Sequence, residues 1–215
     1  MRERRRYAVF MLRIYLARHG QDEDNASSIL NGRRDMPLTE LGFGQAEQLA
    51  ASIKEHHLAF DAIYTSPLMR ARRTAEIIAA GLGAKAPIVL ADLIERDFGV
   101  MTGKPVQDIE KMCAPNIIKA HPVVYFINPQ GAETFPEEMA RSRKVIDWVK
   151  GKHADGNVLL VTHGDIGKML YAAYYHLDWK SVLTMFHFGN SELLLLAEDS
   201  PAEETHVFAT EQHNH

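Results

Sequence analysis

Two apolar runs in this chain each end in a histidine that is followed by glycine. Residues 12–17 lead into Arg18-His19-Gly20, and residues 157–162 lead into His163-Gly164. Runs of this length bounded by glycine predict buried β-strands. In open α/β sheets the ligand crevice lies outside the carboxyl ends of the strands, so the two histidines can meet at one site that the sheet holds rigid.

Composition limits the classes of protein that the chain can belong to. Its 215 residues, 46% of them hydrophobic, suit one α/β domain with a sizeable core. A net charge of −4 argues against partners such as nucleic acid or an anionic membrane. The single cysteine, Cys113, excludes an intrachain disulfide, and no apolar segment is long enough to span a membrane. We expect a cytoplasmic protein.

Helical and strand patterns alternate along the chain. Thr39 is a candidate N-cap for an amphipathic helix that reaches His57, and Ser66-Pro67 is the expected start of the next helix. The other expected helices are 136–149, ended by Gly151, and 165–177; the expected strands are 62–65, 88–90, and an antiparallel pair of 183–188 with 192–197. This alternation predicts an α/β fold, a three-layer α/β/α sandwich around a mostly parallel mixed sheet.

One domain is expected, with additions at both ends. Residues 1–10 have the character of an N-terminal extension, with Met11 as an alternative start, and 11–198 form the domain. Within it, about 104–133 is expected to be a lid, because its prolines exclude a helix longer than a short one after Pro105. The tail 199–215 is polar, includes His206, and is expected to be frayed.

The residues near the strand ends can supply a phosphoryl-transfer site. Such a site needs a nucleophile, cations around the phosphoryl oxygens and an acid for the leaving oxygen. His19 lies beside Arg18, and Arg70 falls in the first turn of the helix after the second strand. Glu95 follows the third strand, where a carboxyl group can reach the leaving oxygen.

Other uses of these residues are less well supported by the sequence. A zinc site lacks a third ligand at short spacing from His19 or His163, and a neighbouring arginine disfavours a cation there. Ser66 and Ser191 lie near strand ends, but the chain has no Gly-x-Ser-x-Gly elbow and no glycine-rich phosphate loop. His176, His187 and His206 are better explained as ordinary structural or surface histidines.

Several segments, in this order, resemble the motifs of the histidine phosphatase superfamily, the phosphoglycerate mutase-like group that includes many small phosphatases. The resemblance spans most of the chain and rests on residues 16–20, Asn25, 32–42, 65–71, 93–99 and 161–164. It implies the phosphoglycerate mutase-like fold. It also implies a metal-independent enzyme without a cofactor, which acts on a small phosphorylated substrate, and it allows a homodimer.

The resemblance implies a role for each matching residue. His19 would attack phosphorus to form a phosphohistidine, while Glu95 would protonate the leaving alkoxide and then activate water. Arg18, Arg70 and His163 would hold the phosphoryl oxygens. Asn25 falls at the family's phosphate-contacting asparagine, and Asn190 follows the last long strand, where the family often places another polar contact.

The chain also departs from the family pattern. Gln21-Asp22 stands where Glu-Ser or Glu-Thr is usual, and Asp165 stands where small neutral residues are common, so two extra carboxylates are expected near the phosphate. The lid has three lysines and no arginine, and its residues 123–126 are largely apolar. This composition favours a phosphomonoester hydrolase over the alternatives, a cofactor-dependent phosphoglycerate mutase or a non-enzymatic phosphate- or phosphoprotein-binding module.

Overall fold

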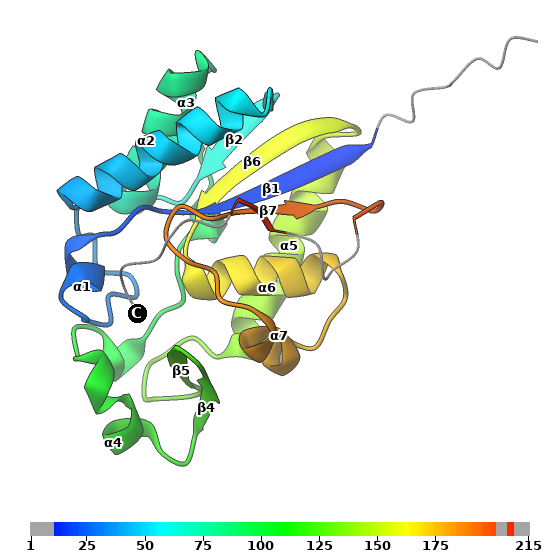
Figure 1. The fold of residues 1–215 in the computed structure, drawn as a ribbon. Coiled ribbons are helices and arrows are strands. Elements are labelled where there is room, and N and C mark those ends of the chain that lie inside the picture. Colours follow the sequence, from blue (N-terminus) through cyan, green and yellow to red (C-terminus); the bar gives the residue numbers. More distant parts are fainter. Residues whose placement is uncertain (1–10, 201–205, 209–215) are drawn as a thin grey trace, which may run out of the picture.

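The computed structural model describes residues 11–200 and 206–208, and in this part of the chain a six-stranded sheet lies between two helical layers (Figure 1). The strand order is β3-β2-β6-β1-β7-β8, with β1, β2, β3 and β6 parallel and β7 and β8 antiparallel to their neighbours. The strands are β1 (Leu12–Arg18), β2 (Ala62–Thr65), β3 (Ile88–Val89), β6 (Gly156–Thr162), β7 (Leu193–Leu196) and β8 (His206–Phe208). The expected fold class is confirmed.

Alternating side chains of the central strands build the core on both faces of the sheet. In β1, Ile14 and Leu16 pack with the helices α5 (Phe135–Lys152) and α6 (Gly164–Tyr174). Tyr15 and Ala17 point the other way, toward α2 (Glu40–Glu55) and α3 (Met69–Leu82). Figure 1 shows these helix pairs on opposite sides of the sheet. Burial of both faces explains why β1 and β6 are continuous apolar runs.

The structure confirms the N-cap of α2 and corrects the start of α3. Thr39 caps α2 by accepting a hydrogen bond from Gly42 N at 3.1 Å. In contrast, α3 begins at Met69 with Leu68 as its N-cap residue, not at Ser66-Pro67. Ser66 N donates to Val161 O at 3.0 Å, which continues the pairing with β6 and keeps residue 66 outside the helix. The left-handed Gly83 ends α3, as one of the two expected glycines.

The expected strand 183–188 is wrong. Helix α7 (Trp179–Met185) occupies the first half of it, is capped by Asp178, and packs Val182 and Leu183 into the core beside α6. A short apolar run does not distinguish a strand from a buried helical turn, which explains the error. Strand β7 pairs instead with β1 and with β8, which lies in the tail that was expected to be frayed.

Smaller corrections concern element ends and the expected terminal extension. α5 passes through Gly151 to Lys152, α6 runs from Gly164 to Tyr174, and the third strand has two residues. Residues 1–10 lie outside the described part of the chain, so their assignment as an extension remains a prediction. Among the described residues, none of the helices has the length and apolar character needed to cross a membrane.

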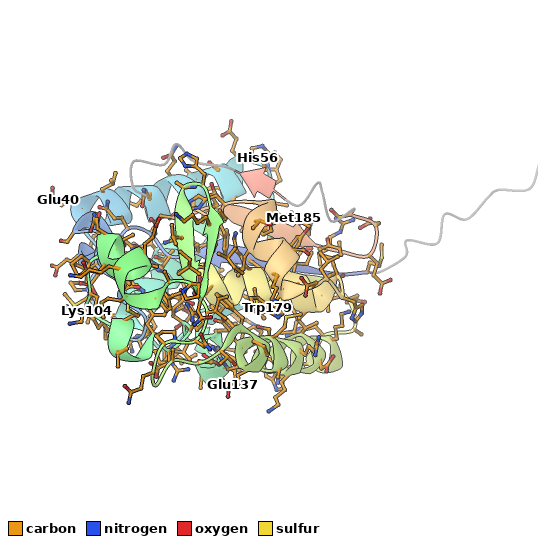
Figure 2. All side chains as sticks on the ribbon, turned by 90° about the horizontal axis from the view of Figure 1, so that it is seen from below. Glu40, His56, Lys104, Glu137, Trp179 and Met185 are labelled. Carbon is orange, nitrogen blue, oxygen red and sulfur yellow. The ribbon has the colours of Figure 1, made fainter. Side chains whose placement is uncertain are left out.

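The segment expected to be a lid is folded around a hairpin. It contains a 3₁₀ turn (Val106–Asp108), α4 (Ile109–Cys113), and the antiparallel strands β4 (Ile117–Ala120) and β5 (Val123–Phe126). The sequence analysis did not predict this hairpin, because the prolines of the segment indicate irregular structure. Figure 2, seen from below, shows Lys104 near the start of this segment at the edge of the molecule.

Three backbone hydrogen bonds attach the start of this segment to residues 28–30. Gly103 N donates to Leu30 O at 2.7 Å, Leu30 N to Lys104 O at 2.9 Å, and Val106 N to Ser28 O at 2.9 Å. The lid and the loop that follows α1 (Glu23–Ala26) therefore form one hydrogen-bonded wall.

Two glycines allow the start of α2 to touch the segment that follows β1. A Cβ added to Gly42 would lie 2.0 Å from Gln21 O, and one added to Gly20 would lie 2.3 Å from Gly42 O. Both contacts are with backbone, which cannot move aside without shifting the loop that carries His19. Gly44, on the same helix, has nothing within 4 Å of an added Cβ.

We predict opposite effects for two alanine substitutions in α2. Gly42→Ala should lower the free energy of unfolding by about 2 kcal/mol or more, because the new methyl group overlaps a backbone carbonyl. Gly44→Ala should raise it by up to about 1 kcal/mol, because alanine is the better helix former and the site is open. Urea denaturation of both variants tests this. A neutral or stabilising Gly42→Ala would contradict the tight contact.

Candidate active site

The parallel pairing of β1 with β6 sets His19 and His163 side by side. Arg18 and Thr162 are register partners, and His19 N donates to Thr162 O at 3.0 Å, so both strands end at the same level. The two imidazole rings lie 5.0 Å apart between centroids, at 60° to each other. The structure thus brings together the two strand-terminal histidines expected from the sequence.

The hydrogen bonds of His19 define which ring nitrogen is free to react. Nδ1 lies 2.6 Å from Gly20 O, which can only accept, so Nδ1 carries the proton. Nε2 lies 3.2 Å from Arg70 Nε, which can only donate, so Nε2 presents its lone pair. Burial, with Arg70 and Arg18 nearby, holds the pKa of His19 well below its usual range. A neutral imidazole with its lone pair on Nε2 has the form of a nucleophile.

His163 is also neutral but has the other tautomer. Its Nδ1 accepts from Arg70 Nε at 3.2 Å, so the proton lies on Nε2, which donates to Ser66 Oγ at 2.6 Å. Burial and the positive charge of Arg70 lower its pKa well below the usual range. Ser66, expected as a helix cap, is therefore the residue that orients His163.

Arg70 is completely buried and bonded on all sides. Nη1 donates to Arg34 O at 2.6 Å, Nη2 to Gly32 O at 2.8 Å, and Nε forms an ion pair with Asp22 Oδ2 at 3.2 Å. Each Nη retains a second N–H that these contacts do not use.

Asp22, expected as an unpaired acid beside the phosphate, is instead the counter-ion of Arg70. It also caps α1 by accepting from Asn25 N at 2.7 Å, and it accepts from Asn31 Nδ2 at 2.6 Å. Burial raises the pKa of Asp22, and Arg70 acts in the opposite direction. The extra carboxylate therefore has local partners and does not face an incoming anion alone.

Arg18 faces the cavity with an unused donor. Its Nη1 donates to Phe188 O at 2.7 Å, whereas Nε is buried and has no hydrogen-bond partner in the part of the chain that the structure describes. A buried unsatisfied N–H of a cation costs free energy that an anionic ligand would recover.

Two asparagines complete this end of the cavity. Asn190 Nδ2 donates to His19 O at 2.9 Å and to Asn25 Oδ1 at 3.3 Å, and both side chains line the cavity. The two polar residues expected from the sequence thus lie together next to His19.

Glu95 reaches the site from the loop after β3 and meets the N-terminus of α6. Its Oε1 accepts from Arg96 N at 2.9 Å and Ile166 N at 3.1 Å, and Oε2 accepts from Asp165 N at 3.4 Å. Burial, reinforced by the Asp165 carboxylate, raises the pKa of Glu95 in spite of these donors. A carboxyl group with a raised pKa is suited to donate a proton near neutral pH.

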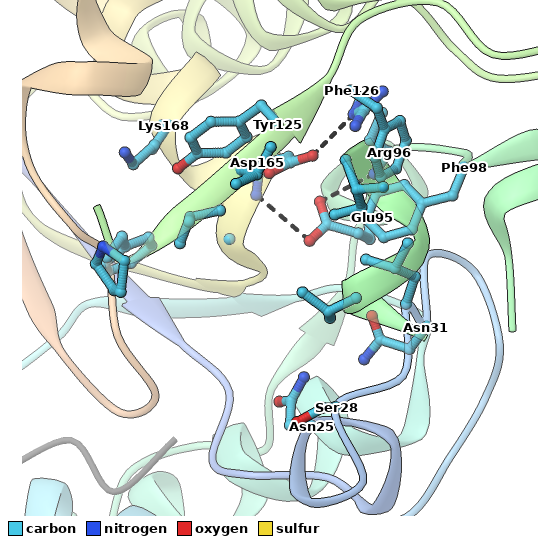
Figure 3. Close-up of a pocket in the computed structure, with 18 of the residues that line it drawn as sticks. Asn25, Ser28, Asn31, Glu95, Arg96, Phe98, Tyr125, Phe126, Asp165 and Lys168 are labelled. Atoms are coloured by element: carbon cyan, nitrogen blue, oxygen red, sulfur yellow. Dashed lines mark hydrogen bonds and ion pairs between the residues drawn. The ribbon is translucent and has the colours of Figure 1, made fainter. Parts of the chain in front are cut away.

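The second extra acid, Asp165, is also paired. Its Oδ2 accepts from Arg96 Nε at 2.8 Å (Figure 3). Arg96 is buried, and its guanidinium carbon lies 4.3 to 5.0 Å from the ring centroids of Phe98, Phe126 and Phe135. Such stacked, bonded arginines hold a carboxylate in one orientation.

A cavity of about 160 Å³ opens in front of Arg18 and Glu95. Figure 3 shows Asn25 and Ser28 at one end, and Tyr125 and Lys168 at the other. The lid contributes only apolar residues and one tyrosine to its wall: Val106, Ile109, Pro122, Val123, Val124, Tyr125 and Phe126. None of the three lid lysines lines it. Within the described residues, no group of three or more histidine, cysteine, aspartate or glutamate side chains could hold a metal ion.

Sequence reasoning missed four residues of the site. Ser66, Asn31, Arg96 and Lys168 orient or border the predicted residues. The only available signal was for Arg96, an arginine next to an expected catalytic acid. Ser66 acts on His163, 97 positions away, and Asn31 and Lys168 act through side-chain contacts across turns that no pattern in the sequence indicates.

The two tautomers predict distinct NMR signatures. Nitrogen–proton correlations should show the Nδ1–H form for His19 and the Nε2–H form for His163. Both rings should remain neutral as the pH falls through 6.5, the ordinary histidine value, because their pKa values are lowered. Substitution of each histidine in turn assigns the signals. A doubly protonated ring at pH 6 would contradict the arrangement.

The chain is similar to known proteins in both sequence and structure. A family model described as "Histidine phosphatase superfamily (branch 1)" matches residues 14–206. A 2,3-bisphosphoglycerate-dependent phosphoglycerate mutase of Methylobacterium sp. (strain 4-46) is 35% identical over 130 residues, which are 60% of this chain and 62% of that relative. The chain thus spans less than two thirds of this relative. The same-named protein of Mesorhizobium japonicum is 31% identical over 172 residues, 78% of this chain and 82% of its own.

Solved structures of phosphatases have the same fold. The mycobacterial glucosyl-3-phosphoglycerate phosphatase in complex with VO3 has a TM-score of 0.73 and 27% identity, covering 85% of this chain and 91% of that one. The phosphoserine phosphatase of Entamoeba histolytica in complex with 3-phosphoglyceric acid has a TM-score of 0.69 and 25% identity, covering 86% and 90%.

Proposed function

This chain belongs to the histidine phosphatase superfamily, branch 1, and we propose that it hydrolyses a small phosphomonoester through a phosphohistidine on His19. The observation that carries the proposal is the position of a nucleophile next to an anion-binding group at one buried site. His19 has its lone pair on Nε2, where it accepts from Arg70 Nε, and the adjacent Arg18, which lines the cavity, has an Nε–H without a partner among the described residues. The first group can attack phosphorus, and the second can bind a phosphoryl oxygen.

In the first chemical step His19 Nε2 forms a bond to phosphorus as the ester P–O bond breaks. Glu95 transfers its proton to the leaving oxygen. The hydrogen bond from Nδ1 to Gly20 O keeps the ring in place throughout, because Nδ1 does not take part. Arg18 and Arg70 supply donors to the phosphoryl oxygens, where charge accumulates in the transition state. His163, whose Nε2–H is bonded to Ser66 Oγ, accepts from Arg70 Nε and helps to hold that guanidinium beside His19.

In the second step a water molecule attacks the phosphohistidine. The Glu95 carboxylate now accepts a proton from that water, the N–P bond breaks, and the electron pair returns to His19 Nε2. Glu95 ends protonated and inorganic phosphate is released, so the cycle is balanced. No metal ion takes part in either step, and activity in the presence of a chelator is part of the proposal.

A phosphoglycerate mutase is the second candidate, because curated relatives carry that name. A mutase must retain a charged phosphorylated acid while it reorients. In the lid, Lys104 and Lys111 are exposed, and Lys119 pairs with Glu110 at 2.8 Å on the surface. The absence of a lid cation from the cavity wall favours hydrolysis. A binding module with little turnover remains the non-enzymatic alternative.

We predict that His19→Ala abolishes phosphate release from an aryl phosphate, by roughly ten-thousandfold or more, while the fold is retained. The assay is run in chelator, with circular dichroism as the check on folding. Wild type quenched in alkaline denaturant, in which the N–P bond is stable, should carry a phosphoryl group on His19 by mass spectrometry. Activity retained by His19→Ala would rule out the covalent mechanism, and loss of wild-type activity in chelator would indicate a metal.

We predict that Glu95→Gln affects poor leaving groups most. Turnover of an alkyl phosphate should fall roughly a hundredfold or more, because its alkoxide needs a proton. Turnover of an aryl phosphate should fall much less, because its leaving group is a stable phenolate that does not need a proton. The ratio of kcat/KM for the two esters is the measurement, and an equal loss for both would remove Glu95 from the acid role.

A further inference from the structure

A buried lysine at the end of the cavity opposite Asn25 has no anionic partner. Lys168 lies on α6 with 2% of its surface exposed, yet it forms no ion pair with any described residue. The acid nearest in sequence, Asp165, is bonded to Arg96. A buried ammonium group without a counter-charge is unfavourable. Its position therefore needs an explanation beyond packing.

Lys168 has one N–H left for a ligand. Its Nζ donates to Leu183 O at 2.9 Å and to Phe186 O, at the end of α7 and just beyond it. An ammonium group has three donors, so one remains. Nζ also lies 5.2 Å and 5.0 Å from the ring centroids of Tyr125 and Phe186, which stabilise the charge without using that donor.

Tyr125 places a second donor at the same wall. Its hydroxyl makes no hydrogen bond to a described residue, and burial raises its pKa, so it stays a neutral O–H. Figure 3 shows Tyr125 and Lys168 together at one end of the pocket. Two neighbouring donors without an acceptor favour an oxygen anion as ligand.

A second cavity extends from this point. It has a volume of about 140 Å³, and Tyr125, Lys168, Val123 and His187 border both cavities. Its remaining wall includes the polar residues His121 and Thr184, whereas the lid side of the first cavity is apolar except for Tyr125. A ligand that extends from Arg18 toward the second cavity passes the apolar lid residues before it reaches Lys168 and Tyr125.

We infer that Lys168 and Tyr125 form a specificity site for the leaving group, which ends in an oxyanion and has an apolar section between that oxyanion and the phosphoester. This inference rests on the proposed function and names the substrate class for the same site. A carboxylate and a second phosphate group share the required chemistry. The experiment below distinguishes them.

The test compares three alkyl phosphates of equal chain length that end in a carboxylate, a second phosphate or a methyl group. Several chain lengths are used. At the best chain length, the kcat/KM of wild type for one of the two anionic substrates should be at least about tenfold higher than for the methyl-terminated alkyl phosphate. A difference of this size is expected for a hydrogen-bonded charge. Lys168→Met should reduce this ratio to near one, and Tyr125→Phe should reduce it in part while keeping the ring.

Two readouts separate specificity from a structural role. Lys180→Met, on the exposed side of α7, is the matched control and should retain the wild-type ratio. The ratio should also fall as the pH rises above about 8, because burial lowers the pKa of Lys168 to about 8, with Asp165 opposing this and Arg18 adding to it. Tyr125, His121 and His187 are the other titratable groups at these cavity walls.

The inference fails if wild type shows no preference, or if Lys168→Met lowers kcat/KM equally for charged and neutral esters. The second result would mean that Lys168 has only a structural role, the hydrogen bonds that hold the end of α7 against α6. Should wild type hydrolyse neither these esters nor an aryl phosphate, the proposed hydrolysis fails separately. The same ratios are then measured as Kd values by calorimetry on His19→Ala, with and without Lys168→Met, and equal affinities would overturn the specificity site.

Discussion

Arg70 places a full positive charge where no water reaches, and four segments of the chain are folded around it. The ends of β1 and β6 contribute the two histidines, the loop before α1 contributes Asp22, and residues 32–34 contribute two carbonyl groups. Such a cation is tolerated only because each neighbour accepts a hydrogen bond or carries negative charge. Removing any one of them would disturb the others, so the geometry of the site is a property of the group.

Burial shifts the ionisable residues of this site in opposite directions. Together with the charge of Arg70, it makes protonation of either imidazole unfavourable, so both histidines stay neutral and one can act as a nucleophile. For Glu95, burial and the Asp165 carboxylate make ionisation the unfavourable process, although Arg70 opposes this. Opposite shifts in adjacent groups are a common sign of acid and nucleophile roles within one site.

The sequence predicts the part of the site that depends on strand ends and the part that depends on motifs. His19 and His163 follow from two apolar runs, because parallel neighbouring strands end at one level. The role of Asp22 does not follow from such a pattern, because its counter-ion, Arg70, lies 48 positions further along the chain. The apolar run 183–188 predicts a strand, but its first three residues complete α7, because an apolar run this short can form either structure.

The hydrogen bonds between residues 28–30 and 103–106 have a consequence for how this scaffold diverges. One wall of the cavity is made of two segments that are distant in the sequence but share a backbone ladder. A replacement lid that entered at another angle would leave the amide of Leu30 or the carbonyl of Ser28 without its partner. We therefore expect new substrate ranges on this framework to require replacement of both segments together, as a single inherited unit, or side-chain changes that leave the ladder untouched.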